Sequence, residues 1–464
     1  MVFISLGDTD AIGASCLFLK IEETGLVLDA GADPDEEGPA SLPSFQTIHN
    51  HTGWYVDHAI VTHAHHDHIG ALPVLVEHFP HVLIHMTPAT RDLAGFVLPA
   101  SIRLQRRRLR EGVSIHPPLY DEEQLELMNY LYLTHDFEAP FDVSGLRALA
   151  PVKAQFYYSG HILGSAGVQL TFEEAGQERR VFYSSDTNMR SQSIIPGGQY
   201  PEAPVDVLIL ESTLGADPEA ELTTRRSEER KFQQALQRVI ERGGTVLVPV
   251  FALGRAQEIL ALIDRFKQRG HLPADVPVFT AGGMRAVADI YDTTRYNTPR
   301  LNPDFQVFDV AQRRMPRSHT AKRNALEGPS IHVASSGMMF EGTLSNWVAQ
   351  QLIEDEENAI FLVGFAKEDS PAHRLLNAAQ NGADGVLLDR RMGMQPLHCE
   401  VERFRFSGHS HRRDLIQLVE KLQPQKVVLV HGDIDARQWM ADNIQFFYPE
   451  IEVLLPDAGR PLEV

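Results

Sequence analysis

Short apolar runs bounded by polar or turn-forming residues recur along the first part of the chain, a pattern that predicts buried strands. We expect strands at residues 2–6, 14–21, 25–28, 59–62, 181–186 and 205–210. Apolar residues at helical spacing predict helices at 69–79 and 121–135, the second with acidic residues in its first turn. The N-terminal part is therefore expected to be a layered α/β structure.

The pattern changes near residue 214, after which helical and strand-like segments alternate. We expect helices at 227–241 and ending near 268, and strands at 245–249, 276–280, 330–334 and 359–363. This alternation predicts a second α/β domain of about 180 residues with a parallel sheet. The turn Ser335-Ser336-Gly337 directly follows one of these strands, and such a turn before a helix could bind an anion.

Residues 63–68 contain four histidines and one aspartate, a density that is typical of a metal site. On an extended backbone, His63 and His65 leave the same side of the chain and can reach one ion. Asp67 and His68 follow where the chain turns towards a helix, and can face a second ion. Zinc takes imidazole nitrogen at roughly 2.0–2.1 Å and carboxylate oxygen at a similar distance. The alternative is a solvated histidine-rich loop, and the histidines further along the chain argue against it.

Later residues have the chemistry to complete such a centre. His161 is the only titratable group in the glycine-rich segment 159–167, and we expect it to be the third protein ligand of the first ion. Asp186 ends a predicted strand, and a carboxylate can bridge two cations. His431 also ends a buried strand; alone it would be a core histidine, but beside the upstream residues it becomes a candidate ligand of the second ion. Asp29 either supports a ligand or forms an Asx turn.

The composition, 43% hydrophobic and 22% charged residues over 464 positions, is typical of a soluble globular chain of two or three domains. No run of about 18 apolar residues indicates a membrane span. The N-terminus has neither the basic nor the apolar region of a signal peptide. Cys16 and Cys399 are too few for a disulfide framework and fit a reducing compartment, so we expect a cytoplasmic protein.

The formal net charge of −20 would repel a polyanion at long range, which argues against a simple nucleic-acid binder. A locally positive, metal-containing cleft would still accept one, because salt at about 0.15 M screens charges beyond about 8 Å. Salt adaptation or solubility would explain the acidity equally well. The most basic run, Arg103 to Arg110, either contacts phosphates or, as the simpler interpretation, forms a solvated helix face.

The order of these residues resembles that of a known family. Asp29, the segment 63–68, His161 and Asp186 are similar to the four early motifs of the metallo-β-lactamase fold. Three further residues, separated by a long insertion, resemble the additional motifs of the β-CASP nucleases: Glu211, His409 and His431. Segments 251–258 and 335–338 also resemble family blocks, so the resemblance covers nearly the whole chain. A histidine at the last motif resembles the RNA-processing branch, which includes RNA 3′-end cleavage and polyadenylation endonucleases and ribonuclease J, rather than the DNA-repair branch.

The resemblance implies an αββα sandwich made of residues 1–212 and 396–464, with a β-CASP domain inserted at 213–395 and RNA in the cleft between them. It implies a first zinc ion held by His63, His65 and His161, and a second held by Asp67, His68 and His431. Asp186 would bridge both ions, and Asp29 would support the ligands from behind. His409, positioned by Glu211, would lie beside the scissile phosphate. The expected RNA or phosphate contacts are Ser335, Ser336, Gly337 and Arg255.

The resemblance also implies the reaction. Two cations roughly 3.5–4 Å apart can hold one hydroxide between them and polarise phosphoryl oxygens. Single-stranded RNA would be hydrolysed to 5′-phosphate and 3′-hydroxyl products, with Asp67 among the catalytic residues and protonated His409 stabilising charge or protonating the leaving 3′ oxygen. Manganese could replace zinc, and cleavage could be internal or from the 5′ end. The alternatives are a hydrolase of DNA or of a small ester or thioester, and a non-catalytic subunit of an RNA complex. A homodimer is expected from the resemblance alone.

Three positions depart from the family pattern. His411 stands where the family has an acid, residues 368–374 replace a stretch richer in Gly and Thr, and Ser185 stands where a glycine commonly precedes the bridging aspartate. None of these changes removes a metal ligand, so we predict an active enzyme. Because the chain begins with the fold and ends at Val464, we expect neither the C-terminal extension of ribonuclease J nor a separate N-terminal RNA-binding domain.

Overall fold

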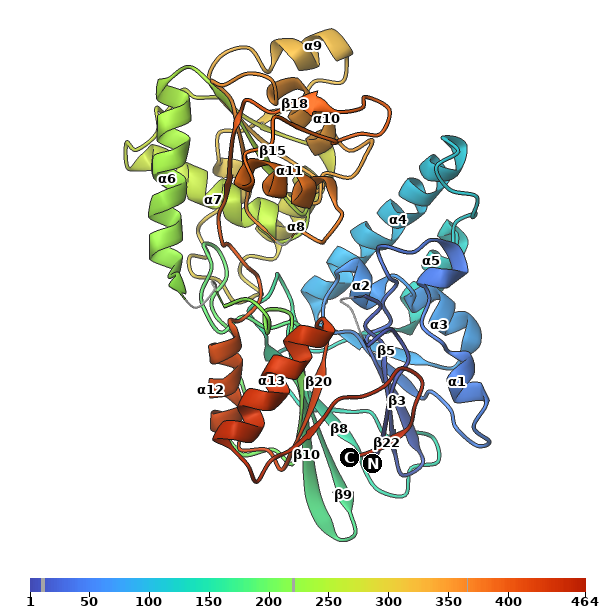
Figure 1. Ribbon diagram of the computed structural model, residues 1–464. Coiled ribbons are helices and arrows are strands. Elements are labelled where there is room, and N and C mark those ends of the chain that lie inside the picture. Colours follow the sequence, from blue (N-terminus) through green and yellow to red (C-terminus); the bar gives the residue numbers. More distant parts are fainter. Residues whose placement is uncertain (10–12, 219–221, 365) are drawn as a thin grey trace. The chain divides into compact units, whose positions relative to one another are not determined.

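The computed structural model describes residues 1–9, 13–218, 222–364 and 366–464 (Figure 1). The chain divides into two compact units. Unit 1 comprises Met1–Ser191, Gly197–Glu221 and His409–Val464, and unit 2 comprises Gln192–Pro196 and Leu222–Gly408. The expected domain boundaries at 212 and 395 stay a prediction, because spatial compactness and the limits of an inserted domain are different criteria.

Unit 1 contains two seven-stranded sheets within the described residues. The first has the order β22 (Leu462–Glu463), β1 (Val2–Ser5), β2 (Leu17–Ile21), β3 (Thr24–Leu28), β4 (His58–Ile60), β5 (Leu83–Met86) and β6 (Tyr132–Thr134). The second has the order β21 (Glu452–Leu454), β20 (Lys426–Val430), β11 (Val207–Glu211), β10 (Gln177–Tyr183), β9 (Ala166–Glu174), β8 (Lys153–Tyr158) and β7 (Phe141–Asp142). The C-terminal strands therefore join both sheets.

The two sheets face each other across an apolar core, to which β1–β3 and β8–β10 contribute side chains such as Phe3, Leu26, Phe156 and Val168. Helices α12 (Arg412–Leu422) and α13 (Ile434–Phe447) cover the other face of the second sheet, where Leu418 and Met440 pack against Leu208. The remaining helices of this unit are α1 (Gln46–His49), α2 (His66–Ile69), α3 (Leu72–His78), α4 (Pro88–Arg110) and α5 (Glu122–Met128), with short 3-10 turns η1 (Gly38–Ser41) and η2 (Asn129–Leu131). Figure 1 shows α3 and α5 beside the first sheet, so the αββα sandwich is confirmed.

Unit 2 is built on a parallel sheet with the order β14 (Arg313–Arg314), β13 (Val278–Thr280), β15 (Ser330–Ala334), β12 (Thr245–Pro249), β16 (Ala359–Leu362) and β19 (Glu400–Arg403). Strand β12 is buried along its whole length, as expected for a central strand between two layers of helices. The helices are α6 (Arg225–Glu241), α7 (Arg255–Gln268), α8 (Gly282–Thr293), α9 (His319–Asn324), α10 (Leu344–Leu352) and α11 (Pro371–Gln380), with the 3-10 turn η4 (Val307–Asp309). A small hairpin pairs β17 (Gly385–Val386) with β18 (Gln395–Pro396). The predicted parallel sheet is confirmed.

Two helix predictions need correction. The helix expected at 121–135 ends at Met128, and Tyr132–Thr134 form the edge strand β6 beside β5. Aromatic and β-branched residues such as Tyr132 and Thr134 pack well on a pleated surface. The helix expected at 69–79 is interrupted after Ile69 and restarts at Leu72, with a proline in its first turn. No helix within the described residues combines the length and the apolar composition that a membrane span needs.

Candidate metal centre

The histidine-rich segment lies between β4 and α2, where the chain leaves the sheet in an extended conformation and then turns into a single helical turn. His63 and His68 are fully buried, and His65 caps the turn with extended backbone angles. Two loops from earlier in the sequence hold this segment through backbone hydrogen bonds. The Ala30 amide donates to the carbonyl of His68 and the Ser15 amide to that of Asp67, at 2.8 Å each. The local fold thus presents four potential ligands towards one region.

The first group of potential ligands comprises His63, His65, His161 and Asp186, with one donor atom from each lying within 4.8 Å of the others. Nε2 of His63 is 3.2 Å and Nε2 of His161 is 3.0 Å from Nδ1 of His65. Oδ2 of Asp186 lies 3.6 Å from His63 and 3.5 Å from His161. Imidazole nitrogens converging beside a carboxylate are the donor set that zinc prefers.

The second group comprises Asp67, His68 and His431. The other carboxylate oxygen of Asp186, Oδ1, lies 3.5 Å from Nε2 of His68, and Oδ2 of Asp67 lies 3.5 Å from Nε2 of His431. Oδ1 of Asp186 also lies 3.2 Å from Nδ1 of His431. Within the described residues, Nε2 of His68, Nε2 of His431 and Oδ1 of Asp186 are buried without a hydrogen-bond partner. Buried polar atoms are rarely left in this state, and a cation between them would satisfy all three, so the residues fit a metal site.

Asp29 supports this group from behind. Its carboxylate lies 2.9 Å from Nδ1 of His68, and accepts hydrogen bonds from the Thr62 hydroxyl at 2.8 Å and the Tyr183 hydroxyl at 3.1 Å. With Nδ1 of His68 engaged by Asp29, Nε2 is the nitrogen that faces Asp186, and a metal would bind it by displacing its proton. The structure therefore places the Asp29 carboxylate behind His68, and its support of a metal ligand stays a prediction.

The charges of the second group are set by their mutual contacts. Burial alone would raise the pKa of Asp186, but the imidazoles of His431 and His68 hold it well below its usual range. Burial alone would lower the pKa of His68, but Asp186 and Asp29 raise it well above the usual value. Ionised Asp186 therefore offers both oxygens to cations at neutral pH.

His409 and Glu211 form a separate pair beside the two groups. Nδ1 of His409 lies 3.0 Å from Oε2 of the fully buried Glu211, whose other oxygen accepts the Thr187 amide at 2.8 Å. Burial opposes the charged form of His409, but the Glu211 and Asp186 carboxylates outweigh it and raise its pKa to about 9. The ring centroid of His409 lies 4.6 Å from that of His161 and 6.1 Å from that of His431, next to one ligand of each group. This pair can hold a proton beside the metal centre.

The departures from the family pattern can now be placed. His411 is the N-cap of α12, and His409 is oriented by Glu211. Ser185 has a φ angle of +49°, in the left-handed region that favours glycine, and its hydroxyl lies 2.7 Å from that of Thr62. The segment 368–374 runs from a turn into the start of α11, where the Ser370 hydroxyl caps the helix by accepting the His373 amide.

Several residues of the site were not anticipated from the sequence. Thr62 binds Asp29 through both its amide and its hydroxyl, and Tyr183 reaches the same carboxylate. The Thr213 hydroxyl lies 3.0 Å from Nδ1 of His431. The only signal was position, because each of these hydroxyls lies at or just beyond the end of a buried strand that leads to a residue of the site.

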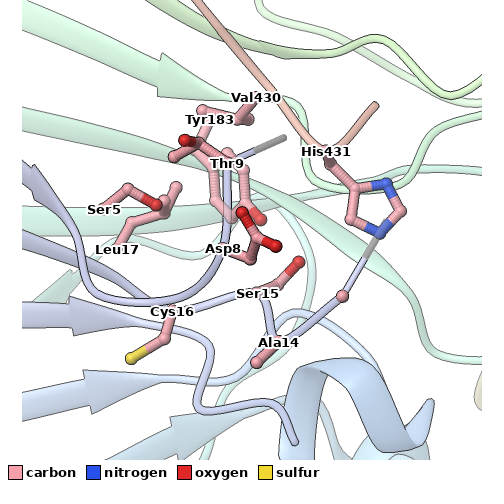
Figure 2. Close-up of a pocket in the computed structure, with 11 residues that line it drawn as sticks. Ser5, Asp8, Thr9, Ala14, Ser15, Cys16, Leu17, Tyr183, Val430 and His431 are labelled. Carbon is pink, nitrogen blue, oxygen red and sulfur yellow. The ribbon is translucent and has the colours of Figure 1, made fainter. Parts of the chain in front are cut away.

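A small hollow borders this site on the side of the loop between β1 and β2 (Figure 2). Asp8, Ser15, Tyr183 and His431 line it, and the Cys16 sulfur points away from His431. Burial, and then the Asp29 charge, raise the pKa of Cys16 well above the usual value, so its thiol stays protonated at neutral pH.

The expected RNA contacts lie in unit 2. Arg255 and Gly337 line one hollow together with Phe251, beyond the ends of β12 and β16. Ser335 and Ser336 continue from β15 into a turn, and the Ser336 hydroxyl accepts the Phe340 amide at 3.3 Å. The basic run on α4 is largely neutralised, since Arg106, Arg107 and Arg108 pair with Glu122, Glu111 and Glu37. These ion pairs favour the simpler interpretation, a solvated helix face.

The chain matches three protein families along its length. Residues 9–139 match the metallo-beta-lactamase superfamily, 256–375 the Beta-Casp domain, and 394–456 the Zn-dependent metallo-hydrolase RNA specificity domain. A crystal structure of a protein of unknown function from Enterococcus faecalis has a similar fold, with a TM-score of 0.54 and 11% identity, covering 100% of this chain and 99% of that one.

Named relatives are similar over almost all of this chain. Endoribonuclease YSH1 from Eremothecium gossypii is 29% identical over 93% of this chain, and cleavage and polyadenylation specificity factor subunit 3 from Dictyostelium discoideum is 27% identical over 97%. The chain spans about half the length of these two relatives, 55% and 56% respectively. An RNase J-like protein from Methanocaldococcus jannaschii is 28% identical, over 97% of this chain and 98% of that protein.

The sandwich of two sheets, with histidine and aspartate groups gathered at the strand ends, defines a metallo-hydrolase of the metallo-β-lactamase superfamily. Divalent-metal use follows from this class and from the donor sets. The further matches show that residues 256–375 form a Beta-Casp domain and residues 394–456 an RNA specificity domain of Zn-dependent metallo-hydrolases.

Proposed function

We propose that this chain is a zinc-dependent ribonuclease that hydrolyses phosphodiester bonds in single-stranded RNA and leaves 5′-phosphate and 3′-hydroxyl ends. One observation carries the proposal: the two oxygens of Asp186 face two separate donor groups, and Oδ1 of Asp186 and Nε2 of His68 and His431 are buried without partners in the described part of the chain. Family membership and the names of the relatives support RNA as the substrate.

His63, His65 and His161 would hold one zinc ion, Asp67, His68 and His431 a second, and Asp186 both. When bound, the ions would activate a water molecule and polarise the phosphoryl oxygens. Asp67, with a side chain 21% exposed against 3% for Asp186, is the carboxylate that solvent reaches, and we assign it to accept a proton from the attacking water. Manganese could replace zinc, since the same oxygen and nitrogen donors bind it.

His409 supplies the second proton transfer. Its Nδ1 is engaged by Glu211, we assign its Nε2 to the substrate, and its raised pKa keeps it protonated at neutral pH. As the bond from phosphorus to the 3′ oxygen breaks, Nε2 donates its proton to that oxygen, and the 3′-hydroxyl leaves.

The test is cleavage of 5′-labelled and 3′-labelled single-stranded RNA by the native chain and by Asp67→Ala and His409→Ala, with metal content measured on each. We expect cleavage to fall in both variants and metal content to fall in Asp67→Ala alone. The two label patterns separate internal cleavage from digestion from the 5′ end. If the native chain carries two metal ions and leaves RNA intact, the ribonuclease proposal is wrong, and DNA and small esters are the substrates to test next.

Two further proposals concern the location and the oligomeric state of the protein. A cytoplasmic location is supported by Cys16 and Cys399, which are both buried free thiols. A homodimer is supported by the family resemblance, and sedimentation of the purified chain would test it.

A further inference from the structure

Two exposed histidines of unit 1 lie together outside the metal centre. His49 is the last residue of α1 and His78 is the last residue of α3, and both side chains are exposed. Figure 1 shows α1 and α3 next to each other, and Nε2 of His49 lies 3.3 Å from Nδ1 of His78. The two imidazoles therefore meet at the surface, although 29 positions separate them in the sequence.

Buried aromatic side chains hold both of these rings in place. The His49 ring stacks on that of Phe79, with ring centroids 4.8 Å apart and an angle of 16° between the planes. The His78 ring packs against that of Phe45, with centroids 5.3 Å apart. Phe45 and Phe79 are both buried, so each imidazole rests on a fixed surface. Because this packing restricts rotation of the imidazoles, less conformational freedom is lost when they bind a ligand.

The separation of the two nitrogens suits two ligands of one metal ion. Zinc binds imidazole nitrogen at roughly 2.0–2.1 Å, so two nitrogens of a tetrahedral site are about 3.3 Å apart. The 3.3 Å between His49 and His78 agrees with this value. In the buried pair of His58 and His85, by contrast, the nitrogens lie 2.9 Å apart, the length of an ordinary hydrogen bond. The surface pair thus has the spacing of metal ligands.

The protonation and the surroundings of the pair also favour a cation. Burial, and then the neighbouring His49 imidazole, lower the pKa of His78 below its usual value, so the ring is mostly uncharged at neutral pH. With its proton on Nε2, the His78 ring directs the lone pair of Nδ1 towards His49. The charge of Glu77 acts on the pKa of His78 in the opposite direction, so this carboxylate is near enough to attract a cation to the pair.

We propose that His49 and His78 form a surface metal site, separate from the metal centre, which binds one divalent transition-metal ion such as zinc. Nε2 of His49 and Nδ1 of His78 would hold the ion, and water molecules would occupy its remaining coordination positions. With only two protein ligands, the surface metal site should bind zinc more weakly than the metal centre does. The bound ion would link α1 to α3.

The test is the number of zinc ions that the full chain binds, measured by titration with zinc against a competing chelator. We expect the native chain to bind one ion more than a double variant with His49→Gln and His78→Gln. Each single variant should bind this ion more weakly by at least about tenfold, because loss of a ligand costs no less than loss of a residue that supports one. Thermal unfolding without metal checks that the variants fold as the native chain does.

His51→Gln is the matched control. His51 lies two positions after His49, but its ring stacks on that of Trp54, with centroids 4.0 Å apart, and is not part of the pair. This variant should bind as many zinc ions as the native chain. Equal numbers of ions in the native chain and the double variant would overturn the proposal and leave the pair as a hydrogen bond. Loss of the same ion in His51→Gln would also overturn it, because binding would then not depend on the pair.

The surface metal site and the ribonuclease function can be tested separately. The expected difference of one ion between the native chain and the double variant does not depend on how many ions the metal centre holds. The double variant with a filled metal centre should cleave RNA as the native chain does, because neither histidine belongs to that centre. Loss of cleavage in this variant would place the pair in the reaction and overturn the assignment of a separate site.

Discussion

The Thr213 hydroxyl lies 3.0 Å from Nδ1 of His431, and the same oxygen lies 3.3 Å from the His431 carbonyl. His431 has a φ angle of +50°, a strained conformation for a residue other than glycine, so the ring needs support to stay in place. The contact with Thr213 engages Nδ1 of the His431 ring, and Nε2 of the same ring is directed towards Asp67. It is therefore a positioning residue for a proposed ligand of the second ion.

Replacing Thr213 by valine removes this hydrogen bond while keeping the shape of the side chain. Loss of such a contact behind a metal ligand lowers affinity by about ten- to a hundredfold, and we expect this loss at the second ion only. Titration with zinc against a competing chelator measures both affinities. Thr213→Ser retains the hydroxyl and should restore the native value; equal affinities in Thr213→Val and the native chain would show that the contact is incidental.

His409 and Glu211 predict a specific change in the pH profile. The proposed role needs His409 protonated, so activity should fall as pH rises through its pKa. Glu211→Gln removes the charge that, after burial, contributes most to this pKa, so the alkaline fall should move to lower pH. The measurement is kcat against pH for RNA cleavage, with the metal content of each sample determined.

His409→Ala should lower kcat by about a hundredfold to ten-thousandfold, the range for losing a general acid, with both metal ions retained. The same measurements distinguish the alternative that His409 is itself a ligand, because its nitrogen also lies within 4.8 Å of Asp186 and Glu211. Loss of a metal ion in His409→Ala would support that alternative.

The candidate ligands within residues 63–68 could be predicted from the sequence because their chemistry is local, whereas the complete donor sets came from the family resemblance. Histidines two residues apart on an extended segment must share a side, and acids at the ends of parallel strands must meet at one sheet edge. The pairing of His409 with Glu211 joins residues 198 positions apart, and only the family resemblance brought them together. The supporting hydroxyls of Thr62, Tyr183 and Thr213 have no spacing signal, because their roles depend on the packing of one sheet against the other.

The errors in secondary structure have a similar origin. Edge strand β6 forms because β5 offers an unpaired edge, a fact of tertiary structure that local sequence does not contain. The left-handed backbone conformation of Asp29, Ser185 and His431 could not be predicted from the sequence either, because none of the three is a glycine. These residues all lie at strand ends around the proposed centre, where the surrounding contacts compensate for the strain.

Metal binding should stabilise unit 1, because the buried donors without partners exist only in the folded chain. Zinc at a hundredfold excess over its dissociation constant should raise the free energy of unfolding by about 2.7 kcal/mol per site. Asp186→Asn, which offers one neutral oxygen in place of the shared carboxylate, should abolish most of this gain. Thermal unfolding with and without zinc measures the effect. Asp206→Asn, a change on the far end of the same sheet, is the control and should keep the full zinc response.

A row of three histidines predicts acid sensitivity in unit 1 that is independent of the metal. Nδ1 of His58 lies 2.9 Å from Nε2 of His85, whose Nδ1 lies 2.9 Å from Nε2 of His135. His58 donates through Nε2 to the Ser144 carbonyl at 3.1 Å, so the row is complete when each ring carries one proton. Burial, and then the two neighbouring imidazoles, lower the pKa of His85 to about 3.

The sign follows from proton binding. Below the ordinary histidine value of about 6.5, the unfolded chain binds a proton at this residue that the folded chain does not, so stability falls as pH decreases. The loss is about 1.4 kcal/mol for each pH unit between about 6.5 and the folded value, and it disappears above that range. His85→Leu should be less stable than the native chain at pH 7.5 by about 1–2 kcal/mol, because two hydrogen bonds are lost. At pH 5 the native chain has lost about 2 kcal/mol of stability at His85, so His85→Leu should be as stable as the native chain or slightly more stable. Urea unfolding of both proteins at the two pH values, with a chelator present, measures the difference. A deficit that is the same at both values would show that the buried ring is protonated in the folded state.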